Sequence, residues 1–501
     1  MERVLRFAIA HGLVESEDRA FVRNVLLDIL GLKAPVAQPE GDETLPETIT
    51  QLLTQLTDDA VSRGIIPDSA GARDRFGVRI CGAITPAPRV IREQFAQKYA
   101  QEGPRAATKW FYKLCRACDY IRVDHIAKNK FYIEDSPAGP LEVTINLSKP
   151  EKDPLEIAAV LEDNKVSYPK CMLCVQNEGY AGRPGYPARF NHRIVPLSLS
   201  GDRYLLQYSP YLYYNEHCIV LNHKHIPMKV DRQTIERLFD FVEQFPHYFL
   251  GSNADLPIVG GSILDHDHFQ GGAHVFPMDK AKPRMVLNAP DDGIEAYIVN
   301  WPMTCIRLIG SDREQLIDAS VKMLDAWRAY SDESEDVLSH TYAPHNTITP
   351  IVRRMADEWL VHLVLRNNRV TKEHPLGIFH PHADLHHIKK ENIGLIEVMG
   401  LFILPGRLLP ELDAARAYLT GQRALSDIPA PTEEVSKHYD WICELAKVNG
   451  SDMDAESAQR VLRQGLAAKC ARVLADAGVF KNDEAGNAAL LRFMGTLGYK
   501  Q

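Results

Sequence analysis

The sequence has few features of a membrane protein or of a disulfide-bonded scaffold. Its most apolar later stretch, residues 393–405, is interrupted by Glu397 and is too short to span a bilayer. The first residues contain neither a long apolar run nor a small-residue cleavage pattern, so we expect no signal peptide. Nine cysteines in 501 residues are too sparse for a disulfide framework. We therefore expect a cytoplasmic protein with reduced thiols and no membrane segment.

The sequence also lacks an excess of basic residues. The net charge is −9, whereas a dedicated nucleic-acid-binding protein normally carries clustered positive charge. Apolar residues make up 45% and charged residues 25% of the chain, which is ordinary for a globular protein. The length suggests about three domains, or one large domain with additions. We expect a sizeable core and no nucleic-acid partner.

The first 120 or so residues have the apolar spacing of helices. One expected helix is capped by Ser16 and stopped by Gly31, with its apolar residues on one face. Further helices are expected over residues 49–64 and 105–122. Residues 136–153 contain three prolines and several charges, a composition typical of a linker or surface excursion.

Beyond residue 190 the spacing changes to that of strands. The turn residues Ser200 and Gly201 lie between two apolar runs, which predicts a hairpin, and Asp231 is placed to cap a helix. The other expected elements are strands at 216–222, 256–263, 294–310 and 358–366, and helices at 312–330, 390–402 and 408–501. This pattern predicts an α+β fold with mostly antiparallel sheets.

The stretch SILDHDHFQGG, residues 262–272, places His266, His268 and Gln270 at alternate positions. Side chains alternate between the two faces of a strand, so a strand here would carry all three on one face. Neighbouring members of the row would be roughly 6.6 Å apart. That spacing suits one substrate or two adjoining sites.

Two CxxC pairs are candidate metal ligands. The pair Cys171 and Cys174 follows Tyr168-Pro169 and precedes a loop rich in glycine and proline, which is the usual setting of a zinc knuckle. The pair at 115 and 118 lies in a helical, aromatic pattern, which favours simple packing. One CxxC pair is half of a zinc site. His223, His225 and His266 are the candidates to complete it, and the alternative is a pair of buried thiols beside surface histidines.

The row HDHFQ resembles the signature of the histidine-triad superfamily, and glutamine at its third position is similar to the transferase branch. Upstream, Asn253 and the run Gly260-Gly261-Ser262 resemble the segment that precedes this row in hexose-1-phosphate uridylyltransferases, and CMLC resembles their zinc knuckle. The stretches that resemble the larger, second branch of that family are ESEDRAFVRN, RIVPLSL, QYSPYLYYNEHCIVL, PHNTITPI and HHIKKENIGLIEVMGLFILPGRL. The likeness covers roughly residues 1–420.

Some positions depart from the family pattern. Asp267 stands where the smaller branch has proline, and Cys115 and Cys118 stand where small residues such as serine are expected. The smaller branch also has a second metal site in its C-terminal half. The possible counterparts here do not align cleanly, so we do not carry the second metal over and leave its presence open; they are His380, His382, His386 and His387.

The resemblance implies a histidine-triad-like catalytic core over residues 155–405, made of two similar halves. A helical N-terminal region over 1–150 and a helical C-terminal region over 406–501 would flank it. The implied reaction transfers the uridylyl group from UDP-glucose to galactose 1-phosphate, with ping-pong kinetics. Relatives in the smaller branch are dimers, which suggests a homodimer here.

The resemblance also implies roles for single residues. His268 would be the nucleophile that forms a uridylyl-histidine, and the amide of Gln270 would donate to a phosphate oxygen. A structural zinc would be held by Cys171, Cys174, His225 and His266, with His225 preferred to His223. The diphosphate would be held by Gly260, Gly261, Ser262 and Asn253, and the uridine pocket lined by Asn191 and Arg193. Weaker candidates for the sugar phosphate are Arg353, Arg354, Arg366 and Arg369.

Two alternative functions remain open at this point. One is a different nucleotidyltransferase of the same superfamily, such as a dinucleoside-polyphosphate phosphorylase, which also uses the His-x-His-x-Gln row. The other is a zinc-stabilised nucleotide-binding module without turnover. A comparison of UDP-glucose with diadenosine tetraphosphate as donor distinguishes a uridylyltransferase from the phosphorylase. A uridylyl adduct trapped on the protein excludes the binding module.

Overall fold

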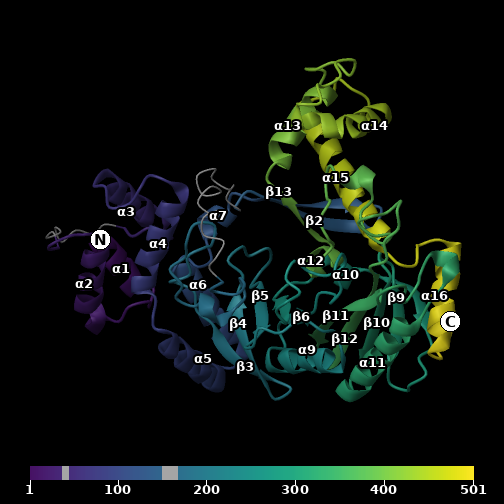
Figure 1. Ribbon diagram of the computed structural model, residues 1–501, viewed down its shortest axis with the longest axis horizontal. Coiled ribbons are helices and arrows are strands. Elements are labelled where there is room, and N and C mark those ends of the chain that lie inside the picture. Colours follow the sequence, from purple (N-terminus) through teal and green to yellow (C-terminus); the bar gives the residue numbers. More distant parts are fainter. Residues whose placement is uncertain (36–43, 149–166) are drawn as a thin grey trace. The chain divides into compact units, whose positions relative to one another are not determined.

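The computed structural model describes residues 1–35, 44–148 and 167–501, which fold into two compact units (Figure 1). The segments Met1–Lys128, Ser148–Ile226 and His266–His268 form unit 1; Asn129–Leu147, Pro227–Asp265 and Phe269–Gln501 form unit 2. Helices and largely antiparallel strands make up the chain, which confirms the predicted α+β class. Within the described ranges, no helix has both the length and the apolar character needed to cross a bilayer.

Unit 1 begins with helices, as its sequence predicts. Gly31 follows the second helix with φ +59°, in agreement with its expected role as a stop. The expected cap at Ser16 was wrong, because Ser16 begins a single 3-10 turn and the α-helix starts only at Arg19. The helices are α1 Glu2–Ala10, α2 Arg19–Ile29, α3 Thr50–Ser62, α4 Ala70–Ile84, α5 Pro88–Glu102, α6 Pro104–Ala117 and α7 Val123–Ile126.

The sheet of unit 1 contains the predicted hairpin. Its strands β3 Val195–Leu199, β4 Asp202–Tyr208 and β5 Cys218–Asn222 pair antiparallel in that order. Ser200 and Gly201 both have positive φ, +48° and +81°, which suits a two-residue turn whose twist matches the strands. The hydroxyl of Tyr208 donates to a backbone carbonyl of α6 at 2.9 Å, so this helix packs against the sheet.

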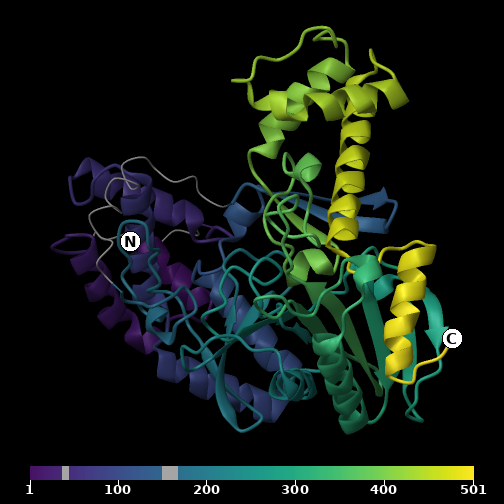
Figure 2. The same ribbon diagram turned by 45° about the vertical axis from the view of Figure 1, so that its right-hand side comes forward.

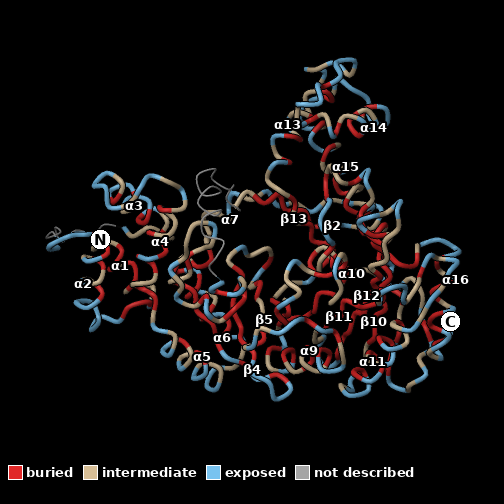
Figure 3. Tube along the Cα trace, viewed as in Figure 1, coloured by how far each residue is buried: buried red, intermediate tan, exposed pale blue. Residues whose placement is uncertain are grey.

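The main sheet of unit 2 has the order β7-β6-β11-β12-β10-β9-β8. Its central strands are almost completely buried (Figure 3). Helix α9 starts where predicted, because Asp231 accepts a hydrogen bond from the N–H of Thr234 at 3.1 Å. The strands are β6 Phe249–Gly251, β7 His268–Gly272, β8 Pro283–Leu287, β9 Glu295–Val299, β10 Cys305–Gly310, β11 Asn346–Met355 and β12 Glu358–Asn367; the helices beside them are α9 Arg232–Gln244, α10 Pro277–Lys280 and α11 Arg313–Ala329.

A second, three-stranded sheet in unit 2 corrects two predictions. The linker expected over 136–153 is a hairpin up to residue 146, of β1 Lys130–Ser136 and β2 Gly139–Asn146, and its residues 149–153 lie outside the described part. Two of the prolines that suggested a linker lie in or beside its turn. The helix expected over 390–402 is only α12 Leu395–Val398, followed by β13 Leu401–Pro405, which pairs parallel to β2.

The C-terminal part is helical, as predicted, and its longest helix is the 23-residue α15 (Figure 2). The strand expected over 256–263 was wrong. The chain instead makes a tight turn there, with a single bridge between Ala254 and Gly260 and a positive φ at Ile258. The helices are α13 Leu408–Leu419, α14 Tyr439–Asn449, α15 Ala455–Ala477 and α16 Glu484–Thr496.

Candidate active site and metal centre

Four side chains from three stretches of unit 1 converge to one point. Cys171, Cys174, His225 and His266 each offer one ligand atom, and these atoms lie within 4.8 Å of one another. The two Sγ atoms are 3.5 Å apart. Cys171 Sγ is 3.2 Å from Nδ1 of His266, and Cys174 Sγ is 3.1 Å from Nδ1 of His225. The structure thus brings together the four residues predicted as metal ligands.

The geometry of this cluster fits one tetrahedral ion. Zinc binds sulfur at about 2.3 Å and nitrogen at about 2.0–2.1 Å, which puts the ligand atoms of a tetrahedral site roughly 3.3–3.8 Å apart. The four measured separations run from 3.1 to 3.7 Å. Two thiols and two imidazoles suit zinc in their chemistry as well. The described residues contain no second group of this kind, and His223 is outside it.

Hydrogen bonds outside the cluster orient its members. Nε2 of His266 is 2.9 Å from the carbonyl oxygen of Asn222, so this ring turns Nδ1 toward the cysteines. The amide of Asn177 donates to the carbonyls of Cys171 and Cys174 at 2.9 and 2.8 Å, which fixes the turn between them. The hydroxyl of Tyr186 donates to the same Cys171 carbonyl at 3.0 Å. These bonds hold the ligand set in place from several sides.

The other CxxC pair is packed inside unit 1, as its helical pattern predicted. Cys115 lies in α6 and Cys118 just follows it, and both are buried. The Sγ of Cys118 lies 3.7 Å from the carbonyl oxygen of Cys115. Burial raises the pKa of the Cys118 thiol to about 11 and that of Cys115 well above its usual value. Both sulfurs are therefore protonated thiols at neutral pH, which are poor metal ligands.

His268 is held in one tautomer by the backbone two residues before it. Its Nδ1 is 2.8 Å from the carbonyl oxygen of His266. A carbonyl can only accept, so Nδ1 carries the proton and the neutral ring has its lone pair on Nε2. The residue is only 6% exposed. A buried imidazole with a basic Nε2 is suited to attack on phosphorus.

The residue between the two histidines has a bonding network that the sequence did not reveal. Asp267 is buried, and its Oδ2 accepts hydrogen bonds from the hydroxyl of Tyr204 and from Nδ2 of Asn222. Its backbone N–H donates to the carbonyl of Ile226, and its carbonyl accepts from the N–H of Asn222. In the sequence, only the alternation of side chains along a strand hinted that Asp267 points away from the two histidines. Its partners come from β4 and β5.

The histidine row lies only partly in a strand, although the whole row was predicted to do so. Strand β7 starts at His268, so His268 and Gln270 alternate onto one face, while His266 lies in the bend before it. The expectation of three residues in one strand was therefore wrong for His266. The bend lets its ring reach the cysteines. Gln270 is half-buried and pairs opposite Gly251 of β6.

The glycine pair before the row lies in a tight turn of unit 2. A Cβ at Gly260 would come within 2.6 Å of the carbonyl oxygen of Ala254, and one at Gly261 within 2.9 Å of Nδ2 of Asn253. The other end of the Asn253 amide accepts from the N–H of Leu395 at 2.8 Å. Ser262 follows at the surface. Gly260 has no room for a Cβ because backbone carbonyls surround it, and a Cβ at Gly261 would displace the Asn253 side chain. Asn253 braces the turn against α12.

Asn191 and Arg193, predicted to line a uridine pocket, are both buried in unit 1. Nδ2 of Asn191 donates to the carbonyl of Cys118 at 2.9 Å. The guanidinium of Arg193 donates to four backbone carbonyls, which are those of Thr85, Pro86, Phe190 and His192. Burial lowers the pKa of Arg193. Both side chains have structural partners, and their role in uridine binding stays a prediction.

The arginines considered for the sugar phosphate also contact protein groups. Each of the four contacts a different group within unit 2: an acidic side chain, an aromatic ring or a backbone carbonyl. The partners are Asp279 for Arg353, the ring of Trp359 for Arg354, the carbonyl of Ile393 for Arg366, and Asp336 for Arg369. These contacts satisfy each guanidinium at least in part, so the structure singles out none of the four.

Known proteins match the chain along most of its length. The family models described as the N-terminal and C-terminal domains of galactose-1-phosphate uridyl transferase match residues 14–227 and 240–441. The galactose-1-phosphate uridylyltransferase of Caldanaerobacter subterraneus subsp. tengcongensis is 47% identical over 509 residues, covering 100% of this chain and 98% of the relative. That of Bacillus subtilis is 44% identical over 506 residues, with the same coverage.

The chain is thus an enzyme of the nucleotidyltransferase class. Among these enzymes it belongs to the galactose-1-phosphate uridylyltransferase family. Among solved structures, yeast Ap4A phosphorylase matches 65% of this chain and 89% of its own, at 12% identity and a TM-score of 0.31. That score is below the level that defines a shared fold.

Proposed function

We propose that the protein transfers the uridylyl group of UDP-glucose to galactose 1-phosphate, through a covalent uridylyl-histidine at His268. Membership of the family supports the substrates. The observation that carries the covalent step is the 2.8 Å bond from Nδ1 of His268 to the carbonyl of His266. This bond leaves the ring lone pair on Nε2 without any need for a separate base.

Two displacements at the α-phosphorus complete the exchange. In the first, the lone pair of His268 Nε2 forms a bond to phosphorus while the bond to the bridging oxygen breaks. Glucose 1-phosphate leaves with that electron pair. In the second, a phosphate oxygen of galactose 1-phosphate attacks the same phosphorus, and the P–N electron pair returns to Nε2. No net proton is transferred, and the kinetics are ping-pong.

Gln270 supports both displacements in this proposal. It alternates onto the same strand face as His268, and its amide N–H can donate to a non-bridging phosphate oxygen as charge moves there. A carboxamide has no proton that dissociates near neutral pH, so it does not help water to attack. The turn at Gly260 and Gly261, with Ser262 and Asn253, is proposed to approach the diphosphate through backbone N–H groups.

Zinc is proposed as the ion held by Cys171, Cys174, His225 and His266. Four protein ligands leave no open position, so the ion would be structural and would supply no substrate contact. Its contribution is to tie the knuckle to the bend at His266. That bend positions the carbonyl that orients His268.

A labelled substrate tests the covalent step. Incubation with UDP-glucose labelled in the uridine, without acceptor, should leave an acid-labile label on one peptide that contains His268. His268→Gly should lose the label and the transfer activity. Gln270→Ala should still be labelled, with transfer slower by about 10²–10³, since one bond to developing charge typically contributes that much. A label on another residue, or normal transfer by His268→Gly, would refute the assignment.

A further inference from the structure

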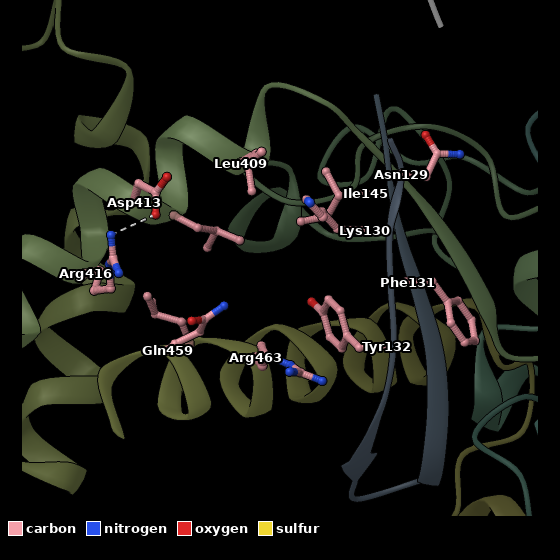
Figure 4. Close-up of a pocket in the computed structure, with 12 residues that line it drawn as sticks. Asn129, Lys130, Phe131, Tyr132, Ile145, Leu409, Asp413, Arg416, Gln459 and Arg463 are labelled. Atoms are coloured by element: carbon pink, nitrogen blue, oxygen red, sulfur yellow. Dashed lines mark ion pairs between the residues drawn. The ribbon is translucent and has the colours of Figure 1, made fainter. Parts of the chain in front are cut away.

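A cavity of about 430 Å³ lies in unit 2, and none of the residues that line it has been given a role above (Figure 4). Its walls are one face of α13, one face of α15 and the hairpin β1–β2. On α13, Leu409, Leu412 and Arg416 follow one another at helical spacing, and on α15 Leu462 and Arg463 lie three and four residues after Gln459. The cavity therefore lies between regular elements rather than in a surface loop.

The charged groups of this cavity are mostly cationic. Lys130, Arg416 and Arg463 line it, against the single carboxylate of Asp413. Asp413 pairs with Arg416 at 3.2 Å; the side chain of Asp413 is exposed and that of Arg416 is partly exposed. Figure 4 shows Arg416 and Gln459 on the side of the cavity opposite β1. An anion that enters would meet two guanidinium groups and one ammonium group.

Two polar atoms in this cavity have no hydrogen-bond partner in the described chain. The hydroxyl of Tyr132 is buried and makes no hydrogen bond, and in Figure 4 it points into the space between the two helices. Nε of Arg463 is also buried and makes none, although Glu134 lies 3.3 Å from it. The guanidinium of Arg463 lies over the Tyr132 ring, 4.2 Å from its centre. Buried donors of this kind cost stability unless another molecule bonds to them.

We propose that this cavity binds a small phosphate ester, and that it is a second ligand site distinct from the uridylyl-transfer residues. The cations at Lys130, Arg416 and Arg463 would hold the phosphate, since guanidinium groups match phosphate oxygens in two-point contacts. The Tyr132 hydroxyl supplies a further donor. Leu409, Leu412 and Leu462 form an apolar wall for the organic part.

The size of the cavity limits the ester. Pockets for small ligands run from about 300 to 1,000 Å³, so 430 Å³ admits a hexose phosphate or a mononucleotide. Both present the same phosphomonoester group, with a charge of about −1.5 to −2 at neutral pH. The proposal is independent of the function proposed above.

Calorimetric titration of the full chain tests this site with inorganic phosphate, glucose 6-phosphate and UMP. At least one probe should bind, and its dissociation constant should rise about tenfold or more in Arg416→Gln, because a charge-assisted bond is lost. Tyr132→Phe keeps the ring under Arg463 and removes only the hydroxyl, so it should weaken binding a few-fold. The matched control is Arg460→Gln, a charge change at an exposed position of α15 outside the cavity.

Each outcome decides the proposal. If glucose 6-phosphate or UMP binds more tightly than the other probes, that result identifies the class of ester that the cavity recognises. If inorganic phosphate binds as tightly as the esters, the phosphate group alone is recognised. Heat that is unchanged in Arg416→Gln comes from another site and overturns the proposal, as does the absence of binding by all three probes. Transfer activity without probe should be normal in all three variants, which also shows that they fold.

Discussion

Asp267 connects the two histidines beside it through the backbone, although its own side chain is turned away from them. Its Oδ2 accepts bonds from Tyr204 and Asn222, and the carbonyl of Asn222 accepts from the ring of His266. The residue therefore determines where the His266 carbonyl lies. That carbonyl in turn fixes the tautomer of His268. In the proposed mechanism this carboxylate would be a positioning group and not a catalytic one.

Asp267→Asn should lower kcat about tenfold, which corresponds to about 1.4 kcal/mol of transition-state stabilisation. A neutral amide accepts weaker bonds than a carboxylate, so the strand would hold His268 less firmly. KM should change little, because Asp267 contacts no substrate in the proposed mechanism. Steady-state kinetics with both substrates gives this split.

Asp265→Asn is the matched control for that substitution, because Asp265 is exposed two residues earlier. It should leave kcat unchanged. Zinc content should be normal in both variants. A loss of zinc in Asp267→Asn would mean that the substitution disrupts the metal cluster, and a change in KM alone would contradict the positioning role.

The residues of the site differ in how far the sequence could reveal them. Alternation along one short stretch was enough to pair His268 with Gln270, because their relation lies within a single strand. The partners Tyr204 and Asn222 were not foreseen. Their bonds to Asp267 depend on which strands lie side by side, and that is decided by long-range pairing that periodicity does not encode.

At the scale of elements, a zinc ion bound at the knuckle of residues 171–174, as proposed, would hold two stretches that local structure alone would not fix. His225 lies just after β5 and His266 just before β7, both in non-strand segments. A tetrahedral ion that binds all four side chains would anchor both strand ends. Binding free energy at such a site is also folding free energy, because the site does not exist in the unfolded chain.

Cys171→Ser should lose roughly one equivalent of zinc per chain, because a four-ligand structural site tolerates the loss of a thiolate poorly. The variant should also unfold at a lower temperature. Metal content measured by mass spectrometry and a thermal melt check both effects. Cys443→Ser in α14 of unit 2 is the control and should keep its zinc. Unchanged zinc in Cys171→Ser would exclude Cys171 as a ligand.

Local start and stop signals predicted some elements correctly, whereas two elements near β13 were missed because their form depends on distant partners. Helix α9 has its cap at Asp231, and the hairpin β3–β4 has turn residues at Ser200 and Gly201. Strand β13 has no such signal. Its apolar run suits either a helix or a buried strand, and it is a strand because β2 lies parallel beside it. The hairpin β1–β2 was obscured by prolines near its turn.

At the scale of the whole molecule, buried neutral histidines occur in both units. Burial lowers the pKa of His192 in unit 1 and of His362 in unit 2 well below the usual value. Burial also lowers the pKa of His387 to about 3, and the nearby His438 adds to that effect. Nδ1 of His387 lies 2.6 Å from Nδ1 of His438, whose other nitrogen bonds to Glu411. These rings cannot take up protons without losing packing.

The protein should therefore become less stable as the pH falls below about 6.5. The folded pKa values are lower than the unfolded ones, so the unfolded chain binds more protons in acid. The stability from His387 is complete above 6.5 and is lost progressively toward pH 3. Asp119 opposes this trend, because burial raises its pKa to about 7. Burial also raises the pKa values of Glu178 and Asp279, which oppose the trend in the same way. Melting temperatures from pH 7.5 to 5 measure the balance.

His387→Gln is the variant that checks this assignment. Glutamine takes up no proton, so the melting temperature of the variant should fall less between pH 7.5 and 5 than that of the parent protein. The charged groups that act on this position are Asp384, Lys469 and Arg407, together with His438. An equal fall in both proteins would show that His387 is protonated in the folded state as easily as in the unfolded chain.

The four residues of the metal cluster emerge from the ribosome at different times during synthesis. Cys171 and His266 are 95 residues apart in the sequence. At 5–20 residues per second, a ribosome exposes the knuckle roughly 5–19 s before the last ligand. During that interval two accessible thiols have an incomplete ligand set, which oxidants and other soft metal ions can capture. On the proposed zinc assignment, those thiols would need to stay reduced until His266 emerges, and zinc delivered earlier would be held only loosely.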